Sequence, residues 1–353
     1  MKILFLPQTS DLSPAARFRV YQYLPYLERE GIVTTVLPAI KAHQHAAMYD
    51  SPGTFRKLRY YSQAVLERLG KISLISDYDC LMIQKETFPQ MYPLFEQLAA
   101  KKTKKVIFDF DDSIFLKYKY FFNKSFFKGF LKECAHIIAG NDFLAEYAAH
   151  YNENVSVIPT VIDTDIYKYE KKEWQEDLNL GWSGTLTTHQ YLNLLNKPLT
   201  LLFKKYKNLK LVIISNSKEN IQLDIPRERI EFVRWNSARV VEDLKKVDIG
   251  LMPLSDDDWA RGKCGLKALQ YMSLGIPAIC SPVGVNSKII DDGVNGFLAK
   301  DDSEWGTKLE KIVENKELFE NFSVKAQETV VEKYSVKKWL PELISVFKKV
   351  AEQ

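Results

Sequence analysis

Residues 259–277 read WARGKCGLKALQYMSLGIP, a glycine-broken loop that carries three cations and runs into an amphipathic helix. The cations are Arg261, Lys263 and Lys267, and an apolar strand at 278–280 follows a Gly-x-Pro stop. A glycine loop that leads into a helix N-terminus presents N–H groups, and neighbouring cations add positive charge. The stretch therefore favours a site for phosphate oxygens over the simpler alternative, a solvated basic helix cap.

The spacing within this stretch suggests individual roles. Lys263 and Lys267 are four residues apart, so they face the same side if the helix begins near Cys264. Gly265 lets the amide that follows it approach a ligand closely. Gln270 lies one turn further along, where its amide can hydrogen-bond a ribose hydroxyl.

Composition limits the classes of function. The chain has 353 residues, enough for two domains, with 46% hydrophobic and 27% charged residues. Its net charge of +4 does not favour nucleic acid as a partner. It contains neither an apolar run of about 18 residues nor a signal peptide, so we expect a cytoplasmic protein. The cysteines and histidines have no metal-binding spacing, and we expect neither a protein metal site nor a cofactor.

Apolar runs alternate with helical patterns twice along the chain. In the first half, strands are predicted over residues 2–6, 32–37, 80–83, 106–108, 137–139 and 155–158. In the second half, they are predicted over residues 178–182, 209–214, 230–232, 249–252 and 278–279. This alternation predicts an α/β fold with two Rossmann-like parallel sheets that face each other across a cleft.

The chain divides into two predicted domains and a terminal helix. Residues 1–170 form the first domain and residues 171–334 the second, with a charged linker at the crossing. Residues 335–353 contain a helix behind a Ser335 N-cap, which we expect to cross back to the first domain. Near the start of the chain, residues 16–29 show helical periodicity.

Ligands of open parallel sheets bind beyond the carboxyl ends of the strands. Gly184 and Thr185 follow the first strand of the second domain, in a turn whose glycines and hydroxyls suit a diphosphate or a sugar. A glycine turn with a Ser/Thr helix cap is an equal alternative. Arg234 and Trp235 follow the third strand, where they could border a nucleotide base or simply pack.

Three carboxylates follow the 106–108 strand of the first domain, at Asp109, Asp111 and Asp112. Clustered carboxylates at a strand end can bind a divalent metal, act as a general base or hydrogen-bond a substrate hydroxyl. They can also cap a helix N-terminus, where negative charge is favoured. The residues alone do not choose between these roles.

The stretch from Phe115 to Lys132 interleaves aromatic residues with lysines and contains no acid. This pattern suits an anionic membrane surface, a polyanion or a partner protein. It also suits a core helix with a solvated lysine face. Residues 56–61 (RKLRYY) add a second basic and aromatic stretch to the same candidate surface.

Several stretches together resemble retaining glycosyltransferases of family 4. They are GWSGT at 181–185, DIGLMPL at 248–254 and GKCGLKALQYMSLGIPAICSPVGVNSKIIDDGVNGFLA at 262–299. The opening SPAARFRVYQYLPYLEREGI and the FDFDDSIF strand end resemble a bacterial polysaccharide branch of that family, which acts in cell-envelope biosynthesis. The resemblance implies the two-domain GT-B fold, a nucleotide-sugar donor on the second domain and an acceptor on the first. It also implies transfer with retention at the anomeric carbon.

The chain departs from the family pattern at several positions. Two family glutamates that flank the glycine loop fall at Gly262 and Gln270 here. The family Arg and Lys that hold the diphosphate after the first strand of the second domain are also missing. Lys263 and Lys267 are expected to supply that positive charge. A family histidine after a strand of the first domain falls near Gln84.

We therefore expect a retaining glycosyltransferase that moves a sugar from a nucleoside diphosphate to a glycan or lipid-linked acceptor, in the cytoplasm or at the inner face of the plasma membrane. The predicted catalytic residues are Asp109, Asp111, Asp112 and Lys267. The predicted donor-binding residues are Gly184, Thr185, Arg234, Trp235, Arg261, Lys263, Gly265, Leu266, Lys267 and Gln270. The alternatives are a catalytically silent nucleotide-sugar-binding partner subunit, a nucleotide-sugar 2-epimerase of the same fold and a Rossmann dehydrogenase. The dehydrogenase is the weakest of these, because the chain lacks the GxGxxG motif that would support it.

Overall fold

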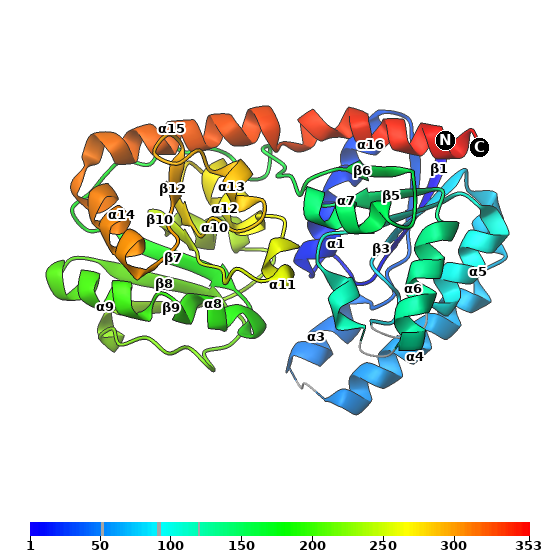
Figure 1. Cartoon of the computed structure of the whole chain (residues 1–353), viewed down its shortest axis with the longest axis horizontal. Coiled ribbons are helices and arrows are strands. Elements are labelled where there is room, and N and C mark those ends of the chain that lie inside the picture. Colours follow the sequence, from blue (N-terminus) through cyan, green and yellow to red (C-terminus); the bar gives the residue numbers. More distant parts are fainter. Residues whose placement is uncertain (51–52, 90–92, 119–120) are drawn as a thin grey trace. The chain divides into compact units, whose positions relative to one another are not determined.

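The computed structural model describes residues 1–50, 53–89, 93–118 and 121–353, which divide into two compact units (Figure 1). Unit 1 contains Met1–Thr160, Gly262–Cys264 and Trp339–Gln353. Unit 2 contains Val161–Arg261 and Gly265–Lys338. Over these described residues, each unit is built around one six-stranded parallel sheet with helices packed against it.

The sheet of unit 1 is made from short apolar runs that are buried in the extended conformation. Its strands are β1 (Lys2–Pro7), β2 (Val33–Val36), β3 (Cys80–Gln84), β4 (Val106–Phe110), β5 (His136–Ala139) and β6 (Val155–Val157). They pair in the order β2-β1-β3-β4-β5-β6, with Leu6 opposite Ile83 and Ile83 opposite Phe108. The strand order reverses between β1 and β3, which creates a topological switch point at the carboxyl edge.

Helices cover both faces of this sheet. They include α1 (Pro14–Arg19), α2 (Leu24–Arg29), α3 (Ala42–Asp50), α4 (Thr54–Gly70), α5 (Leu94–Thr103), α6 (Phe121–Glu133) and α7 (Asp142–Ala149), with 3-10 turns η1 (Tyr21–Tyr23), η2 (Leu74–Asp77) and η3 (Ile114–Lys117). Phe127 and Phe130 of α6 meet Phe108 edge to face, at centroid distances of 5.9 and 5.1 Å. On the opposite face, Phe347 of α16 (Val336–Ala351) meets Phe5 at 5.8 Å. Aromatic packing therefore fills both sides of the sheet.

The helix predicted over residues 16–29 is broken into two helices. α1 ends at Arg19, and Val20 has φ −127° and ψ −67°, outside the helical region. α2 begins at Leu24 and has Pro25 in its first turn. Proline lacks the N–H that a continuous helix needs here, so the apolar periodicity persists while the helix does not.

The sheet of unit 2 repeats the pattern. Its strands are β7 (Asn179–Gly184), β8 (Lys210–Ser215), β9 (Ile230–Arg234), β10 (Ile249–Met252), β11 (Ala278–Cys280) and β12 (Gly296–Leu298), in the order β12-β11-β10-β7-β8-β9. The helical elements are η4 (Leu186–Thr188), α8 (His189–Asn193), α9 (Asn196–Lys205), η5 (Arg227–Arg229), α10 (Val240–Lys245), α11 (Asp258–Arg261), α12 (Leu266–Ser273), α13 (Asn286–Ile289), α14 (Asp302–Glu314) and α15 (Lys316–Lys333). The sequence did not predict β12, because three residues that begin with glycine form no apolar run.

The last helix, α16, contributes to both units. Residues 336–338 belong to unit 2, and the rest of α16 belongs to unit 1. The hydroxyl of Ser335 accepts a hydrogen bond from the backbone nitrogen of Lys338 at 3.3 Å, which confirms the predicted N-cap. Within unit 1, Lys105 Nζ donates to the carbonyl of Ala351 at 2.7 Å and satisfies an oxygen in the last turn of the helix.

A buried ion pair holds α1 to the carboxyl end of β4. Arg19 Nε donates to both carboxylate oxygens of Asp109 at 3.1 Å, and Nη1 donates to the carbonyl of Ile158 at 2.7 Å. The two side chains are 2% and 0% exposed. Removing one member of such a pair leaves the other charge buried without water or a counter-ion. The pair therefore joins α1, β4 and the chain after β6 at one edge of the sheet.

Asp109→Ala is expected to destabilise the protein by about 3–5 kcal/mol, because it leaves the Arg19 guanidinium unpaired in the core. The matched control is Asp77→Ala, at an exposed position of η2, for which a change below about 1 kcal/mol is expected. Urea unfolding followed by circular dichroism measures both. If the two variants prove equally stable, the ion pair does not hold this edge together.

Candidate functional site

The carboxyl ends of β3 and β4 gather charged residues of unit 1. Lys85 Nζ lies 2.8 Å from Asp111 Oδ1 and 2.7 Å from Asp112 Oδ2. Lys85 has φ 59°, a left-handed conformation that is uncommon for residues other than glycine. Its backbone N–H donates to the carbonyl of Asp109 at 2.9 Å. Both the backbone and the side chain of Lys85 thus bind it to the loop that carries the acids.

Two lysines control the charge of Asp112. Burial acts to raise the pKa of this carboxyl, but Lys85 and then Lys263 outweigh burial and hold the pKa below its ordinary value. Burial likewise acts to lower the pKa of Lys85, but Asp111 and Asp112 overcome it and raise the pKa. The side chain of Asp112 is 28% exposed. It can therefore offer a charged carboxylate oxygen to a hydroxyl group at neutral pH.

Residues 262–264 of the cationic loop pack within unit 1. Asn141 Nδ2 donates to the carbonyl of Lys263 at 3.1 Å, and Cys264 Sγ donates to the carbonyl of Asp111 at 3.3 Å. Lys263 Nζ lies 3.9 Å from Asp112 Oδ1. The loop therefore brings the charge of Lys263 to the acids after β4, and we call Lys85, Asp111, Asp112 and Lys263 the acid cluster.

Gly262 lies too close to a neighbouring backbone for a side chain. A Cβ at this position would lie 2.8 Å from the backbone nitrogen of Ser113 and 2.9 Å from the Ser113 Cβ. Because backbone atoms of the facing loop cannot move aside cheaply, glycine is required while the cationic loop lies here. The close approach of Ser113 therefore leaves no room for a glutamate or any other side chain at this position.

The three predicted catalytic acids have different environments. Asp109 is fully buried and paired with Arg19, so the structure gives it a structural role in place of the predicted catalytic one. Asp111 and Asp112 follow the end of β4, with 15% and 28% of their side chains exposed. Of the three predicted acids, these two therefore keep a partly exposed carboxylate.

In unit 2, the turn after β7 is held by its own hydroxyl groups. Thr188 Oγ1 accepts a hydrogen bond from Thr185 N at 3.0 Å and donates to Thr185 O at 2.9 Å. The hydroxyls of Thr185 and Thr187 are 3.0 Å apart, and Leu186 N donates to Asn216 Oδ1 at 2.9 Å. This is the capping alternative that the sequence left open, because the amides of Thr185 and Leu186 already have partners.

The turn after β7 and the first turn of α12 meet at Trp182. This tryptophan is fully buried, and its ring packs against His189 with centroids 5.5 Å apart. Gly184 is required beside it, because a Cβ there would lie 2.5 Å from the Trp182 ring and 2.6 Å from Thr188 Oγ1. Lys267 Nζ lies over the ring, 4.6 Å from its centroid, in a cation–π contact.

The start of α12 separates the two lysines of the cationic loop. The helix begins at Leu266, after Gly265 with a left-handed φ of 70°. It does not begin near Cys264, so the expectation that Lys263 and Lys267 share one helix face is wrong. Lys263 belongs to the acid cluster of unit 1, whereas Lys267 lies at the turn after β7 in unit 2.

Gln270 is a packing residue of α12. Its side chain is 6% exposed, and Nε2 donates to the Tyr167 hydroxyl at 2.8 Å. A hydrogen bond to a ribose hydroxyl needs the amide at the surface. The predicted ribose contact therefore does not fit this geometry.

Three further predicted donor residues are Arg261, Arg234 and Trp235. Arg261 is exposed and pairs with Asp256 at 2.8 Å and Asp258 at 3.4 Å. Arg234 ends β9 and is exposed. Trp235 is half-buried, and its backbone N–H donates to the carbonyl of Ser215, at the end of β8, at 2.9 Å. The sheet order places β8 between β9 and β7, so these two side chains follow a different part of the edge.

Sequence reasoning overlooked two polar residues of these edges. Lys85 follows β3 directly, and Asn216 follows β8 directly. Each is the second polar residue after a predicted apolar run, 80–83 or 209–214, at the kind of carboxyl edge that identified the acids. Applied to every strand, this rule would have found both residues.

The aromatic stretch at 115–132 is largely part of the core. Residues 119 and 120 lie outside the described part of the chain, and the buried aromatic residues on either side of them are Phe115, Tyr118, Phe127 and Phe130. Phe126 is 40% exposed. Among the described side chains of α6, Phe127 and Phe130 therefore belong to the core, and Phe126 is the aromatic one that reaches the surface. Exposed apolar side chains also occur on α4, where Phe55 is 79% and Leu58 is 50% exposed.

Within the described ranges, no group of three or more His, Cys, Asp or Glu side chains is arranged to hold a metal ion. Across those same ranges, every helix falls short of the length or the apolar character that a bilayer crossing needs.

Comparison with known proteins identifies the segment that contains Trp182 and Lys267. Residues 177–315 match the family described as Glycosyl transferases group 1. Over 97% of its length, the chain is 23% identical to an uncharacterized glycosyltransferase of Methanocaldococcus jannaschii and covers 93% of that protein.

Solved structures confirm the predicted GT-B class of α/β fold. HepE of Anabaena, solved with UDP and glucose, aligns with 100% of this chain and 98% of its own, at a TM-score of 0.66 and 14% identity. The sucrose-phosphate synthase of Thermosynechococcus elongatus aligns with 99% of each chain, at a TM-score of 0.72 and 11% identity.

Proposed function

We propose that this chain is a group 1 glycosyltransferase that moves a sugar from a nucleoside diphosphate to a glycan or lipid-linked acceptor, with retention at the anomeric carbon. The observation that carries the proposal is the position of Lys267. Its ammonium lies over buried Trp182, where the turn after β7 meets the first turn of α12. A helix N-terminus and a fixed cation at a carboxyl edge favour a diphosphate.

The chemistry follows from the charges that develop during transfer. Cleavage of the bond between the sugar and the diphosphate leaves positive charge on the sugar ring and negative charge on the leaving group. Lys267 and the first N–H groups of α12 stabilise the leaving diphosphate, and they are in place before the reaction. The acceptor hydroxyl attacks from the face that the diphosphate leaves, and the departing phosphate takes its proton. Retention then requires neither a protein nucleophile nor a metal ion.

The acceptor is assigned to unit 1 through Asp112. Lys85 and Lys263 keep this carboxylate charged, so it accepts a hydrogen bond from a sugar hydroxyl but is a weak base. Its proposed role is to orient the acceptor hydroxyl. Asp111 contributes mainly by holding Lys85 at 2.8 Å.

The fate of the donor sugar tests this function directly. The purified chain is incubated with UDP-, GDP-, dTDP-, CDP- and ADP-sugars, with and without glycan acceptors, and the products are identified by mass spectrometry and NMR. Transfer with the donor's anomeric configuration, undiminished in EDTA, is expected. A donor epimerised without an acceptor would identify an epimerase, and a donor that stays intact in every reaction would identify a silent binding subunit.

Lys267→Ala is expected to weaken binding of the preferred nucleoside diphosphate about tenfold, or about 1.4 kcal/mol, because a charge-assisted contact is lost. Isothermal titration calorimetry measures the affinity. Lys311→Ala is the matched control, since Lys311 also lies over an aromatic ring of unit 2, at 5.5 Å from the Phe297 centroid. Equal affinities of the two variants would remove Lys267 from the donor site.

We further propose that α4 brings the protein to an anionic membrane, such as the inner face of the plasma membrane. Phe55 is 79% exposed and Leu58 is 50% exposed, and Lys57 and Arg59 between and beside them are also exposed. Apolar side chains flanked by cations on one helix suit an anionic lipid surface. A lipid-linked acceptor would be presented at that surface.

Charge reversal on α4 tests the membrane proposal. The double variant Lys57→Glu/Arg59→Glu is expected to reduce co-sedimentation with anionic vesicles at least tenfold, since each cation contributes about 1 kcal/mol near such a surface. Lys124→Glu/Lys132→Glu makes the same charge change at exposed positions of α6. If both double variants lose equal amounts of binding, net charge rather than α4 is responsible.

A further inference from the structure

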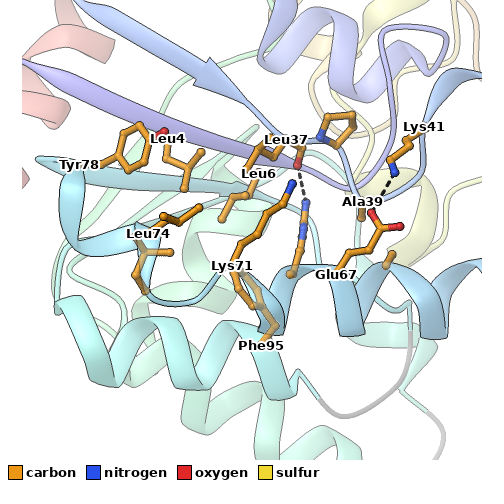
Figure 2. A pocket seen from close by; sticks show the side chains of 14 residues that line it. Leu4, Leu6, Leu37, Ala39, Lys41, Glu67, Lys71, Leu74, Tyr78 and Phe95 are labelled. Atoms are coloured by element: carbon orange, nitrogen blue, oxygen red, sulfur yellow. Dashed lines mark hydrogen bonds and ion pairs between the residues drawn. The ribbon is translucent and has the colours of Figure 1, made fainter.

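A pocket of about 100 Å³ lies in unit 1 between α4 and the β1–β2 side of the sheet (Figure 2). Its apolar lining includes Leu6 of β1, Leu37 after β2, Leu74 of η2 and Phe95 of α5. Leu74 is 49% exposed, so the pocket is open to solvent there. The lining shares no residue with the acid cluster, and the pocket is therefore a separate feature of unit 1.

Arg68 of α4 is the unusual member of this lining. Its side chain is 5% exposed, and its guanidinium lies 5.6 Å from the centroid of the Phe95 ring. Nη2 donates to the carbonyls of Pro7 at 2.7 Å and Leu37 at 3.2 Å, and Nη1 donates to the hydroxyl of Thr87. All of these acceptors are neutral. Nε is buried without a hydrogen-bond partner among the described residues.

A buried guanidinium without a carboxylate partner is costly to maintain. Burial lowers the pKa of Arg68 to about 10, and the charge of Glu96 opposes this only in part. Such a cation gains from an anion that enters the pocket, because the Arg68 side chain lines it. The pocket is thus lined by a cation that has no carboxylate within hydrogen-bond distance among the described residues.

Other charges of the lining add to this positive character. Lys71 and Lys41 also line the pocket, together with the carboxylate of Glu67. Lys41 Nζ pairs with Glu67 at 3.0 Å. Figure 2 shows Lys71 extending from the end of α4 across the pocket toward Leu37. The described lining therefore carries an excess of positive charge beside an apolar wall.

We propose that this pocket binds a small organic anion, with a carboxylate or phosphate head beside the side chains of Arg68 and Lys71 and a short apolar chain against Leu6, Leu74 and Phe95. The apolar wall alone would suit any hydrophobic group, and the cations alone would suit any anion. Their combination within one pocket selects a molecule that carries both parts. This assignment does not depend on the proposed transferase activity.

Calorimetry on the full chain tests the assignment with octyl phosphate as the probe. Octyl phosphate is expected to bind at least about tenfold more tightly than inorganic phosphate or 1-octanol, because each of these supplies only one half of the contact. Phosphatidic acid vesicles present the same head on a lipid. If the vesicles compete with octyl phosphate, the natural occupant is a lipid headgroup, and if they do not, it is a free anion.

Lys71→Glu provides the decisive variant, since Lys71 is exposed and its replacement should leave the fold intact. It is expected to weaken octyl phosphate binding about tenfold, while Lys102→Glu, an exposed control on α5, leaves binding unchanged. Lys267→Ala should also leave it unchanged, which separates this pocket from the donor site. Equal affinities of the Lys71→Glu and Lys102→Glu variants, or a loss confined to Lys267→Ala, would overturn the proposal.

Discussion

All strands of a parallel sheet end at the same edge, and this constraint decides where the candidate site residues of each unit lie. In unit 1 it places Lys85 after β3 beside Asp111 and Asp112 after β4. In unit 2 it places the end of β7 next to the first turn of α12, which lies between β10 and β11 in the chain. The buried pair of Arg19 and Asp109 then locks the first of these edges, because it ties α1 to the end of β4.

The two edges present different groups, and this difference separates their proposed roles. In unit 1, lysines and carboxylates neutralise one another, so Asp112 is an oriented hydrogen-bond acceptor rather than a strong base. In unit 2, Lys267 lies over the face of Trp182 in a cation–π contact, in the first turn of α12. The edge of unit 2 therefore suits a charged leaving group, whereas the edge of unit 1 suits a neutral acceptor hydroxyl.

Much of the fold was predictable because buried parallel strands are continuous apolar runs between helical patterns. The strands of both sheets except β12 were found in this way. Side-chain environments were less predictable. Asp109 and Asp112 belong to the same acidic motif, but only the contact with Arg19 reveals that Asp109 is structural. The interpretation of Gln270 failed because Tyr167, far away in sequence, buries it.

The aromatic stretch illustrates the same limit. Helical spacing of Phe127 and Phe130 is compatible with a core or with a membrane, and only their packing on Phe108 decides for the core.

The most direct test of the donor site is a thermal-shift panel of UDP, GDP, dTDP, CDP and ADP. A ligand that binds only the folded state raises the melting temperature, so the account predicts a clear rise with one of the five. No rise with any of them at millimolar concentration would contradict a nucleoside diphosphate site in unit 2.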